Sequence, residues 1–273
     1  MDYIVGDVQG CCDALDRLLA KIGFSPSRDR LFVLGDLINR GPSNVETLVR
    51  LRGLGASATC LLGNHDLHLL AVAYGLRVPH ADDTLDDVLA SPDREGWVEW
   101  LRSHRLAVHE SGWLMVHAGV VPQWDLADTL ALAGEVEARL RAPDLHDFLE
   151  VMYGNEPSRW DASLAGAARL RFVVNVLTRI RFVHPDGTLE LKRKDASPGA
   201  PGDVLPWFEA PGRRTEGVPI AFGHWSALGL VNRPDLLALD TGCVWGGALT
   251  CVRVDGGRRD VVQEPCTPAR PAV

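Results

Sequence analysis

The chain lacks the features that mark several broad protein classes. No apolar run approaches the roughly eighteen residues of a membrane-spanning helix, so no membrane partner is expected. The first residues contain neither a basic segment nor a long apolar stretch, so no signal peptide is expected. The 28 Lys and Arg residues are outnumbered by 36 Asp and Glu residues. This acidic balance argues against a protein that coats a nucleic-acid backbone, because that mode of binding needs a basic face.

Cysteine is scarce and is not spaced for zinc. The six cysteines include no CxxC pair, which argues against the common zinc and redox motifs. A chain of 273 residues buries enough surface to fold without disulfides. We therefore expect reduced, mostly buried thiols and a cytoplasmic location. The cysteines are Cys11, Cys12, Cys60, Cys243, Cys251 and Cys266.

The composition is that of a globular protein, with 46% hydrophobic and 23% charged residues. Short runs rich in Val, Ile and Leu predict buried strands, and each ends at a glycine or at a metal-binding residue type. These runs are residues 3–5, 31–34, 58–62, 113–116, 220–222 and 236–239. Helical spacing follows the first three runs, so the chain is predicted to have an α/β fold with its site at the strand ends.

The middle of the chain has a helical pattern over residues 84–104 and 126–182. A single domain, residues 1–273, is therefore expected to carry a helical cap insertion over about 84–182. Capping boxes are predicted at residues 43–46 and 84–87. Turns at residues 185–187 and 255–257 predict hairpins, and the Pro- and Gly-rich residues 195–217 predict a loop. The tail from Pro265 is expected to fray.

Side chains able to bind metals follow several predicted strands. They are Asp7, Gln9, Asp36, Asn64, His65, His117 and His224. Oxygen and imidazole ligands without thiolate suit Mn²⁺, Mg²⁺, Co²⁺ or Fe²⁺. One carboxylate can bridge two such ions about 3.5–4 Å apart, which is an arrangement used for phosphoryl displacement. Each residue alone is more often structural, but the joint pattern favours a metal site.

The motifs GDVQG (6–10), GDLINRG (35–41), GNHD (63–66), HAG (117–119) and GH (223–224) resemble, in order, those of the calcineurin-like metallophosphoesterases. Longer stretches, including GNHDLHLLAV (63–72), AFGHW (221–225) and LDTGCVWGG (239–247), resemble the symmetrical bis(5′-nucleosyl)-tetraphosphatases of that superfamily. The resemblance implies a central β-sandwich flanked by helices. It also implies that a metal-activated water cuts diadenosine 5′,5′‴-P1,P4-tetraphosphate into two ADP. Nucleoside-tetraphosphate caps on RNA 5′ ends are a further substrate class that it implies.

The resemblance also implies roles for individual residues. Asp7, Gln9 and Asp36 would hold a first divalent ion. A second ion would be held by Asp36, which bridges the two, together with Asn64, His117 and His224. His65 would be the general acid, and Arg40 would bind phosphate. The expected cofactors are two divalent ions, with Mn²⁺ preferred over Co²⁺ and Mg²⁺.

Two positions depart from the broader family pattern. Gln9 stands where that family has a histidine, and imidazole binds first-row transition metals better than an amide oxygen does. We therefore expect a weaker first metal site. Asn39 replaces an aspartate that orients the catalytic histidine. It is expected to accept a hydrogen bond from the histidine without supplying charge.

Residues 169–194 form a basic segment in an acidic chain. Arg179 and Arg181 are the preferred phosphate clamp that fixes the central cut, because arginine forks match phosphate oxygens. His68, one helical turn beyond His65, is expected to support the site. Four aromatic side chains are expected in the core, although base stacking is an alternative for them. They are Trp124, Trp207, Phe208 and Trp225.

Two other functions stay open at this point. A serine/threonine protein phosphatase of the same superfamily would share the metal site and act on a phosphopeptide. A non-catalytic nucleotide-binding module would explain Gln9 and Asn39, but it would not need both the ligands and the acid. The sequence indicates no stable protein partner.

Overall fold

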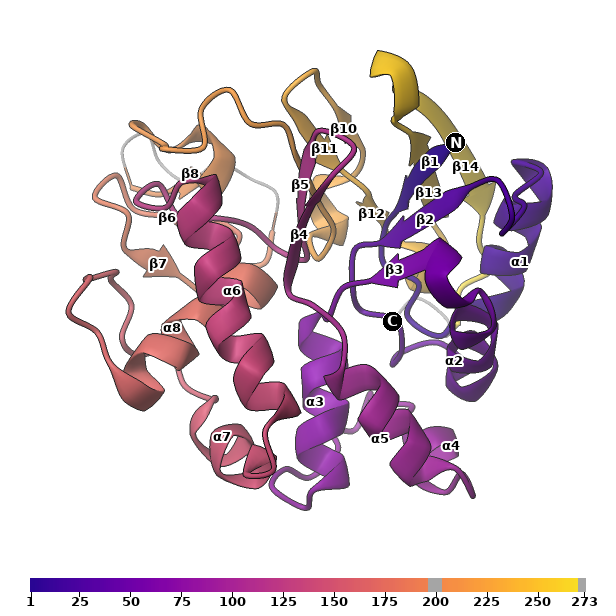
Figure 1. Ribbon diagram of the computed structural model, residues 1–273, viewed down its shortest axis with the longest axis horizontal. Helices are drawn as coiled ribbons and strands as arrows, with labels where there is room; N and C mark the ends of the chain where they lie inside the picture. Colours follow the sequence, from indigo (N-terminus) through magenta and orange to yellow (C-terminus); the bar gives the residue numbers. More distant parts are fainter. Residues whose placement is uncertain (196–202, 270–273) are drawn as a thin grey trace.

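Two β-sheets pack face to face between layers of helices in the computed structural model, which describes residues 1–195 and 203–269 (Figure 1). The first sheet has the order β12 (Asp240–Thr241), β13 (Ala248–Arg253), β1 (Asp2–Val5), β2 (Arg30–Val33) and β3 (Ala58–Cys60), and β14 (Asp260–Pro265) pairs with β13. The second has the order β10 (Val231–Asn232), β11 (Leu236–Ala238), β9 (Ile220–Phe222), β5 (Trp113–Val116) and β4 (Ala107–Glu110). The predicted sandwich flanked by helices is confirmed.

The apolar layer between the sheets explains why the predicted strands are continuous apolar runs. Ile4 and Phe32 from the first sheet belong to one buried cluster with Met115 and Leu237 from the second. The alternate residues Tyr3 and Val33 belong to the cluster that packs against the helices. Because both faces of these strands are buried, no polar residue alternates along them.

The connections bring several strand ends to one edge. The helix α1 (Cys12–Lys21) joins β1 to the parallel strand β2, and α2 (Asn44–Gly53) joins β2 to the parallel strand β3. In the second sheet, β9 is parallel to both β5 and β11. The remaining α-helices are α3 (Asn64–Ala73), α4 (Asp86–Leu89), α5 (Arg94–Arg102), α6 (Leu126–Arg141), α7 (Leu145–Val151) and α8 (Gly166–Arg179).

The expected insertion is helical but not continuous. Between α5 and α6, the strands β4 and β5 belong to the second sheet. A small third sheet follows α8, with β6 (Phe182–Val183) between β7 (Leu189–Glu190) and β8 (Leu205–Pro206). Both predicted hairpins are confirmed, β6–β7 and β13–β14. Residues 196–202 of the predicted loop, with Pro198, Gly199, Pro201 and Gly202, lie outside the described residues.

Both predicted capping boxes are wrong. The Ser43 side chain makes no capping bond; instead Asp87 Oδ2 accepts from the backbone N–H groups of Asn44 (3.0 Å) and Val45 (3.2 Å). The Thr84 hydroxyl donates to the carbonyl of Gly41, and α4 begins only at Asp86. A carboxylate about forty positions further along the chain therefore stabilises the first turn of α2.

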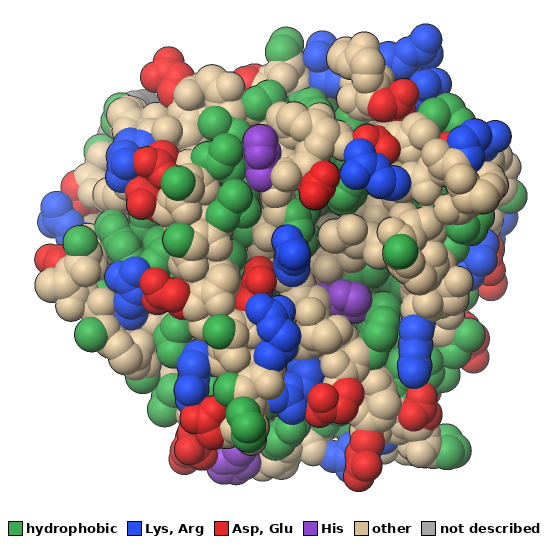
Figure 2. Space-filling view, in the orientation of Figure 1, with side chains coloured by type: hydrophobic (Ala, Val, Ile, Leu, Met, Phe, Trp, Pro, Cys, Tyr) green, Lys and Arg blue, Asp and Glu red, His purple; other side chains and the backbone are tan. Residues whose placement is uncertain are grey.

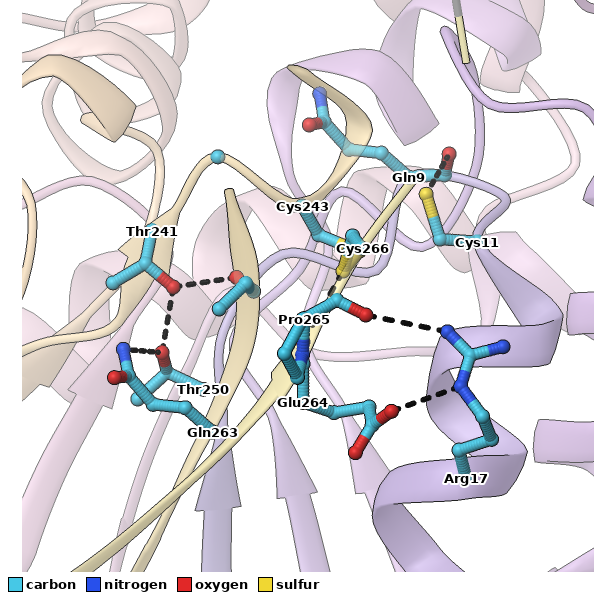
Figure 3. The surroundings of a disulfide bond; sticks show 12 residues. Gln9, Cys11, Arg17, Thr241, Cys243, Thr250, Gln263, Glu264, Pro265 and Cys266 are labelled. Atoms are coloured by element: carbon cyan, nitrogen blue, oxygen red, sulfur yellow. Dashed lines mark hydrogen bonds and ion pairs between the residues drawn. A yellow bond between two sulfur atoms is a disulfide. The ribbon is translucent and has the colours of Figure 1, made fainter. Parts of the chain in front are cut away.

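The expectation that all six cysteines are reduced is also wrong. Cys243 and Cys266 form a disulfide, which joins the 3₁₀ turn η4 (Cys243–Trp245) to the segment after β14 (Figure 3). The other four thiols are free and buried, and burial raises the pKa of Cys11 to about 11. The tail does not fray at Pro265, because the N–H of Cys266 donates to Gly247 and that of Ala269 to Val244. The pairing of β13 with β14 brings the two cysteines together, which their sequence spacing does not reveal.

On the face drawn in Figure 2, Lys and Arg side chains are interspersed with Asp and Glu side chains rather than gathered in one basic field. No helix within residues 1–195 and 203–269 has the length and apolar character needed to cross a membrane.

Candidate active site

The edge where the strands end opens onto a cavity of about 700 Å³. It is lined by all but one of the site residues expected from the sequence: Asp7, Gln9, Asp36, Arg40, Asn64, His65, Arg179, Arg181 and His224. His117 is the exception, because it lies fully buried beneath the cavity floor. Most of these residues follow the carboxyl ends of strands, which is where open α/β sheets place their sites, and Arg179 ends helix α8.

The loops that carry these side chains have unusual backbone conformations. Among the described residues, six that are not glycine have positive φ, and five of these are in the site loops. These five are Gln9 (45°), Asp36 (46°), Asn39 (79°), Arg40 (69°) and His224 (64°). The left-handed region costs a non-glycine residue free energy and persists where the surroundings impose it, as is common at functional sites.

The glycines of the motifs allow carboxylates to approach the backbone. A Cβ at Gly63 would overlap Asp36 Oδ1, and a Cβ at Gly223 would overlap Asp7 Oδ1. The space left by each missing side chain lets a carboxylate accept a backbone hydrogen bond. Asp36 Oδ1 accepts from the N–H of His65 (2.8 Å), and Asp7 Oδ1 accepts from that of His224 (3.0 Å). Close approach, not turn formation, explains these two glycines.

Two buried histidines each hold one lone pair toward the site. His117 Nδ1 lies 2.8 Å from the carbonyl of Leu34, and His224 Nε2 lies 3.1 Å from that of Arg179. Because each of these nitrogens donates to a carbonyl, the lone pairs are on His117 Nε2 and His224 Nδ1. Burial lowers the pKa of His117 to about 4 and that of His224 well below its ordinary value. Both rings are therefore neutral, which is the form that binds metals.

These lone pairs meet a carboxylate and a side-chain amide. Ligand atoms of Asp36, His117 and His224 all lie within 4.8 Å of one another. The Asn64 side-chain amide also reaches this point, where its nitrogen donates to His224 Nδ1 (2.8 Å), His117 Nε2 (3.2 Å) and the carbonyl of Thr178 (3.1 Å). The carboxylate and the two imidazole lone pairs fit a divalent cation of intermediate hardness, and Asn64 can add its amide oxygen when a cation takes the place of its N–H donor.

A second group of acceptors adjoins the first. Asp7, Asp36 and Asp240 are buried, and burial together with their mutual repulsion raises the pKa of Asp7 well above its ordinary value. Burial, opposed by the His65 N–H and reinforced by Asp240, raises the pKa of Asp36 to about 8. The guanidinium of Arg181 partly offsets this charge. Three buried carboxylates gathered at one wall of the cavity also suit divalent cations.

The amide of Asn39 acts as a donor, which corrects the expected hydrogen bond. Its Oδ1 accepts from the backbone N–H groups of Arg40 (2.7 Å) and Thr84 (3.0 Å). Its Nδ2 therefore faces His65 Nδ1 and Asp83 Oδ1, each at 2.9 Å. Because His65 Nδ1 accepts, Nε2 carries the proton. Burial, with Arg40 and His117 nearby, lowers the pKa of His65 to about 3.

Asp83 supplies the charge that Asn39 lacks. Its side chain is buried, 2.8 Å from His68 Nε2 and 3.6 Å from an Arg40 guanidinium nitrogen. Burial would raise its pKa, but hydrogen bonds from Asn39, the His80 backbone and His68 together lower it. His68 Nδ1 lies in turn 3.1 Å from the Tyr153 hydroxyl. A chain of contacts thus runs from Tyr153 to His65.

Three aspartates were not among the expected site residues. Asp240 directly follows the predicted strand at residues 236–239, so the signal that marked the other site residues was present. Asp66 follows the predicted ligand Asn64, and its buried carboxylate accepts from Leu37 (3.0 Å) and Gly63 (2.8 Å), which ties two site loops together. Asp83 lies in a loop without periodicity and could not be distinguished from a surface residue.

The arginines of the basic segment divide between two locations. Arg179 lines the cavity, where Asn175 (2.6 Å) and Asn155 (3.1 Å) hold its guanidinium. Arg181 also lines it and donates to the His224 carbonyl (3.2 Å). Arg169 lies outside the lining and pairs with Glu135. The aromatic residues Trp124, Trp207, Phe208 and Trp225 are at most 7% exposed, so they belong to the core and cannot stack on a base.

The chain is similar in sequence to proteins of a known family. Residues 3–240 match the family model of the calcineurin-like phosphoesterases. The chain is 57% identical over 255 residues to the symmetrical bis(5′-nucleosyl)-tetraphosphatase of Acidovorax ebreus, covering 92% of this chain and 91% of that protein. It is 51% identical over 272 residues to the enzyme of the same name from Ralstonia nicotianae, covering 98% and 95%.

Solved structures share the fold at lower identity. A crystal structure assigned as a diadenosine tetraphosphatase is 24% identical and has a TM-score of 0.64, with 97% of this chain and 93% of that chain covered. A protein-tyrosine phosphatase from a Shewanella species is 18% identical, with a TM-score of 0.53 and coverages of 97% and 80%.

Proposed function

Because the chain belongs to the calcineurin-like phosphoesterase family, we propose that it hydrolyses diadenosine tetraphosphate symmetrically to two ADP. The observation that carries the proposal is the convergence of acceptor atoms and arginines on one cavity. The acceptors suit divalent ions, and Arg40, Arg179 and Arg181 suit the phosphate chain.

The metal ligands follow from the two groups of acceptors. Asp36, Asn64, His117 and His224 would hold one ion, and Asp7, Gln9 and Asp36 would hold the other. When bound, two divalent ions lower the pKa of water and offset the charge on phosphate oxygens. Mn²⁺ is the proposed metal, because the mixed oxygen and imidazole set suits it better than it suits Mg²⁺.

His65 is proposed to act on the leaving oxygen. The Asn39 amide keeps His65 Nδ1 as an acceptor, so the proton is on Nε2. This nitrogen lies on the side of Asp36, 3.9 Å from its Oδ2. A neutral imidazole offers a hydrogen bond rather than a full proton. That is sufficient for an ADP phosphate, which is a better leaving group than an alkoxide.

Arg179 and Arg181 are proposed to set the position of the cut. The four phosphates are chemically similar, so a central cut needs groups that fix the chain along the cavity. Asn175 and Asn155 hold the Arg179 fork before substrate binds, which lowers the entropy cost of clamping phosphate.

A nucleoside-tetraphosphate cap on RNA has the same anhydride chain, so the same residues would act on it.

We further propose a cytoplasmic location, where the four buried free thiols would stay reduced. Alkylation of thiols at lysis tests this location: alkylated Cys243 and Cys266 would support it, and an intact Cys243–Cys266 disulfide would contradict it, because such disulfides are rare in the cytoplasm.

The test compares two substrates and one isosteric variant. With Mn²⁺, the wild type should hydrolyse diadenosine tetraphosphate and leave a phosphoserine peptide intact. Asp36→Asn keeps the acceptor for the His65 N–H but removes the bridging charge, and it should lower turnover at least 100-fold. Asp16→Asn, at an exposed ion pair with Arg50, is the matched control. Preferential hydrolysis of the peptide would favour a protein phosphatase instead.

A further inference from the structure

Trp245 differs from every other tryptophan in the chain. It is 58% exposed, whereas the other seven, all within the described residues, are buried or half-buried. Its side chain lines the cavity that also contains Asp7, Asp36 and Arg181. Leaving a large indole in water is unfavourable, and tryptophan in a polar site is well suited to stack on a planar ligand.

The turn that carries Trp245 is held rigid by its own backbone. Gly242 and Gly246 both adopt the left-handed conformation, with φ of 72° and 89°. The N–H of Trp245 donates to Gly242 (3.0 Å), and that of Gly247 donates to the same carbonyl (2.9 Å). One edge of the indole rests beside Gly242, because a Cβ there would lie 3.7 Å from indole Cδ1.

A second chain segment fixes the same turn from outside. The disulfide joins Cys243 to Cys266 (Figure 3). Pro268 packs against Gly246. Backbone hydrogen bonds from Cys266 to Gly247 and from Ala269 to Val244 complete the contact. A side chain presented on such a support loses little conformational freedom when a ligand binds.

The turn also connects directly to the carboxylates of the site. Asp240 Oδ1 accepts from the N–H of Gly242 at 3.1 Å, so the turn that carries Trp245 is tied to Asp240, whose charge acts on Asp7. In a nucleotide a single ribose separates the base from its phosphates. A phosphate chain bound at the carboxylate and arginine groups would therefore bring one base to this wall of the cavity.

We propose that Trp245 is the platform on which one nucleobase of the substrate stacks. This inference rests on the proposed function and names one of its specificity-determining residues. Because every base has a π-face, the platform binds purine nucleotides with little regard to their exocyclic groups. Diguanosine and diadenosine tetraphosphates should accordingly have KM values within about threefold of each other.

The kinetic test separates stacking from catalysis. Trp245→Ala should raise KM for diadenosine tetraphosphate about 10- to 100-fold with kcat within about twofold, and Trp245→Phe should recover much of the loss. Trp100→Phe, a half-buried position on α5 outside the cavity lining, is the matched control and should leave both constants unchanged. Equal KM values for wild type and Trp245→Ala, with equal melting temperatures, would overturn the proposal.

A binding test keeps the inference separate from the activity. ADP should quench the tryptophan fluorescence of the wild type but not that of Trp245→Phe, and pyrophosphate, which has no base, should quench neither. Quenching that is undiminished in Trp245→Phe would overturn the role of Trp245. Failure of the wild type to hydrolyse the dinucleotide would instead overturn the proposed function, and the ADP titration would still decide the stacking role.

Discussion

The side-chain amide of Asn39 donates to Nδ1 of His65 at 2.9 Å and thereby determines which ring nitrogen carries the proton. The direction is fixed because two backbone N–H groups occupy the amide oxygen. The negative charge behind this pair belongs to Asp83, which also lies against Arg40. One buried carboxylate thus positions both the histidine and a phosphate-binding arginine.

This arrangement predicts a partial rescue. Asn39→Asp places a second carboxylate against Asp83 and should lower kcat about 10-fold or more, because the two charges repel and His65 loses its donor. Adding Asp83→Asn removes the repulsion but does not restore the donor to His65, so it should recover part of the loss in free energy. Steady-state kinetics of the two single variants and the double variant measure the coupling. Wild-type kcat in Asn39→Asp would contradict the assigned direction of the hydrogen bond, because a carboxylate cannot donate to His65 Nδ1.

The weaker first metal site predicts a gain of binding. Gln9→His replaces an amide oxygen with imidazole and should lower the Kd of the weaker Mn²⁺ about tenfold, or by about 1.4 kcal/mol. Calorimetric titration and the metal content after gel filtration measure this change. Gln123→His, outside the cavity lining, should leave metal binding unaltered. Equal Mn²⁺ affinities in wild type and Gln9→His would remove Gln9 from the ligand set.

The division of the basic segment predicts unequal effects of two arginines. Arg179→Ala should raise KM about 10- to 100-fold, since a charge-assisted hydrogen bond contributes about 1.5–3 kcal/mol. It should also allow some ATP and AMP to form. Arg169→Ala removes the same charge from the same helix, but its partner is Glu135, so KM should stay within about twofold. Similar increases in KM for both variants would indicate that the positive charge of the helix acts at long range, rather than that Arg179 contacts the phosphates directly.

One buried carboxylate far from the site predicts a pH dependence of stability. Asp29 accepts from Arg28 (2.8 Å), the Ser25 backbone (2.9 Å) and the N-terminal amine (3.2 Å), and these hold its pKa far below the ordinary 3.8. Because the folded pKa is lower than the unfolded one, the stabilisation is fully present well above pH 4 and is lost as the pH falls below it.

Asp29→Asn should therefore lower the free energy of unfolding by about 1–3 kcal/mol at pH 7, and the gap to wild type should narrow toward pH 3. Urea denaturation of both proteins at pH 7, 5 and 3 measures this difference in the free energy of unfolding. Asp16→Asn, whose carboxylate is half exposed beside Arg50, should cost less than about 1 kcal/mol at pH 7. A gap that widens on acidification would contradict the sign.

The sequence was informative where burial on both faces produced continuous apolar runs. All six predicted strands are present, and the metal-binding residue types that follow them line or underlie one cavity. The short strand β4 was not predicted, because its last two residues, His109 and Glu110, are exposed and break the apolar run.

Contacts between distant segments could not be predicted from local patterns. Asp87 stabilises the first turn of α2, Cys266 reaches Cys243 only after β14 pairs with β13, and Asp83 meets Asn39 only after α3 and the following loop fold back. The sequence does not distinguish Trp245 from a core tryptophan, because its exposure depends on a turn built by two left-handed glycines. Each of these features depends on three-dimensional packing rather than on periodicity.

The most direct measurement is the identity of the products formed from diadenosine tetraphosphate with Mn²⁺, resolved by anion-exchange chromatography at early times. ADP should be the sole nucleotide product, with two formed per substrate consumed, and no product should form when a chelator removes the metal. ATP and AMP in equal amounts would show that the cavity does not hold the phosphate chain in the central register, and would contradict the account of Arg179 and Arg181.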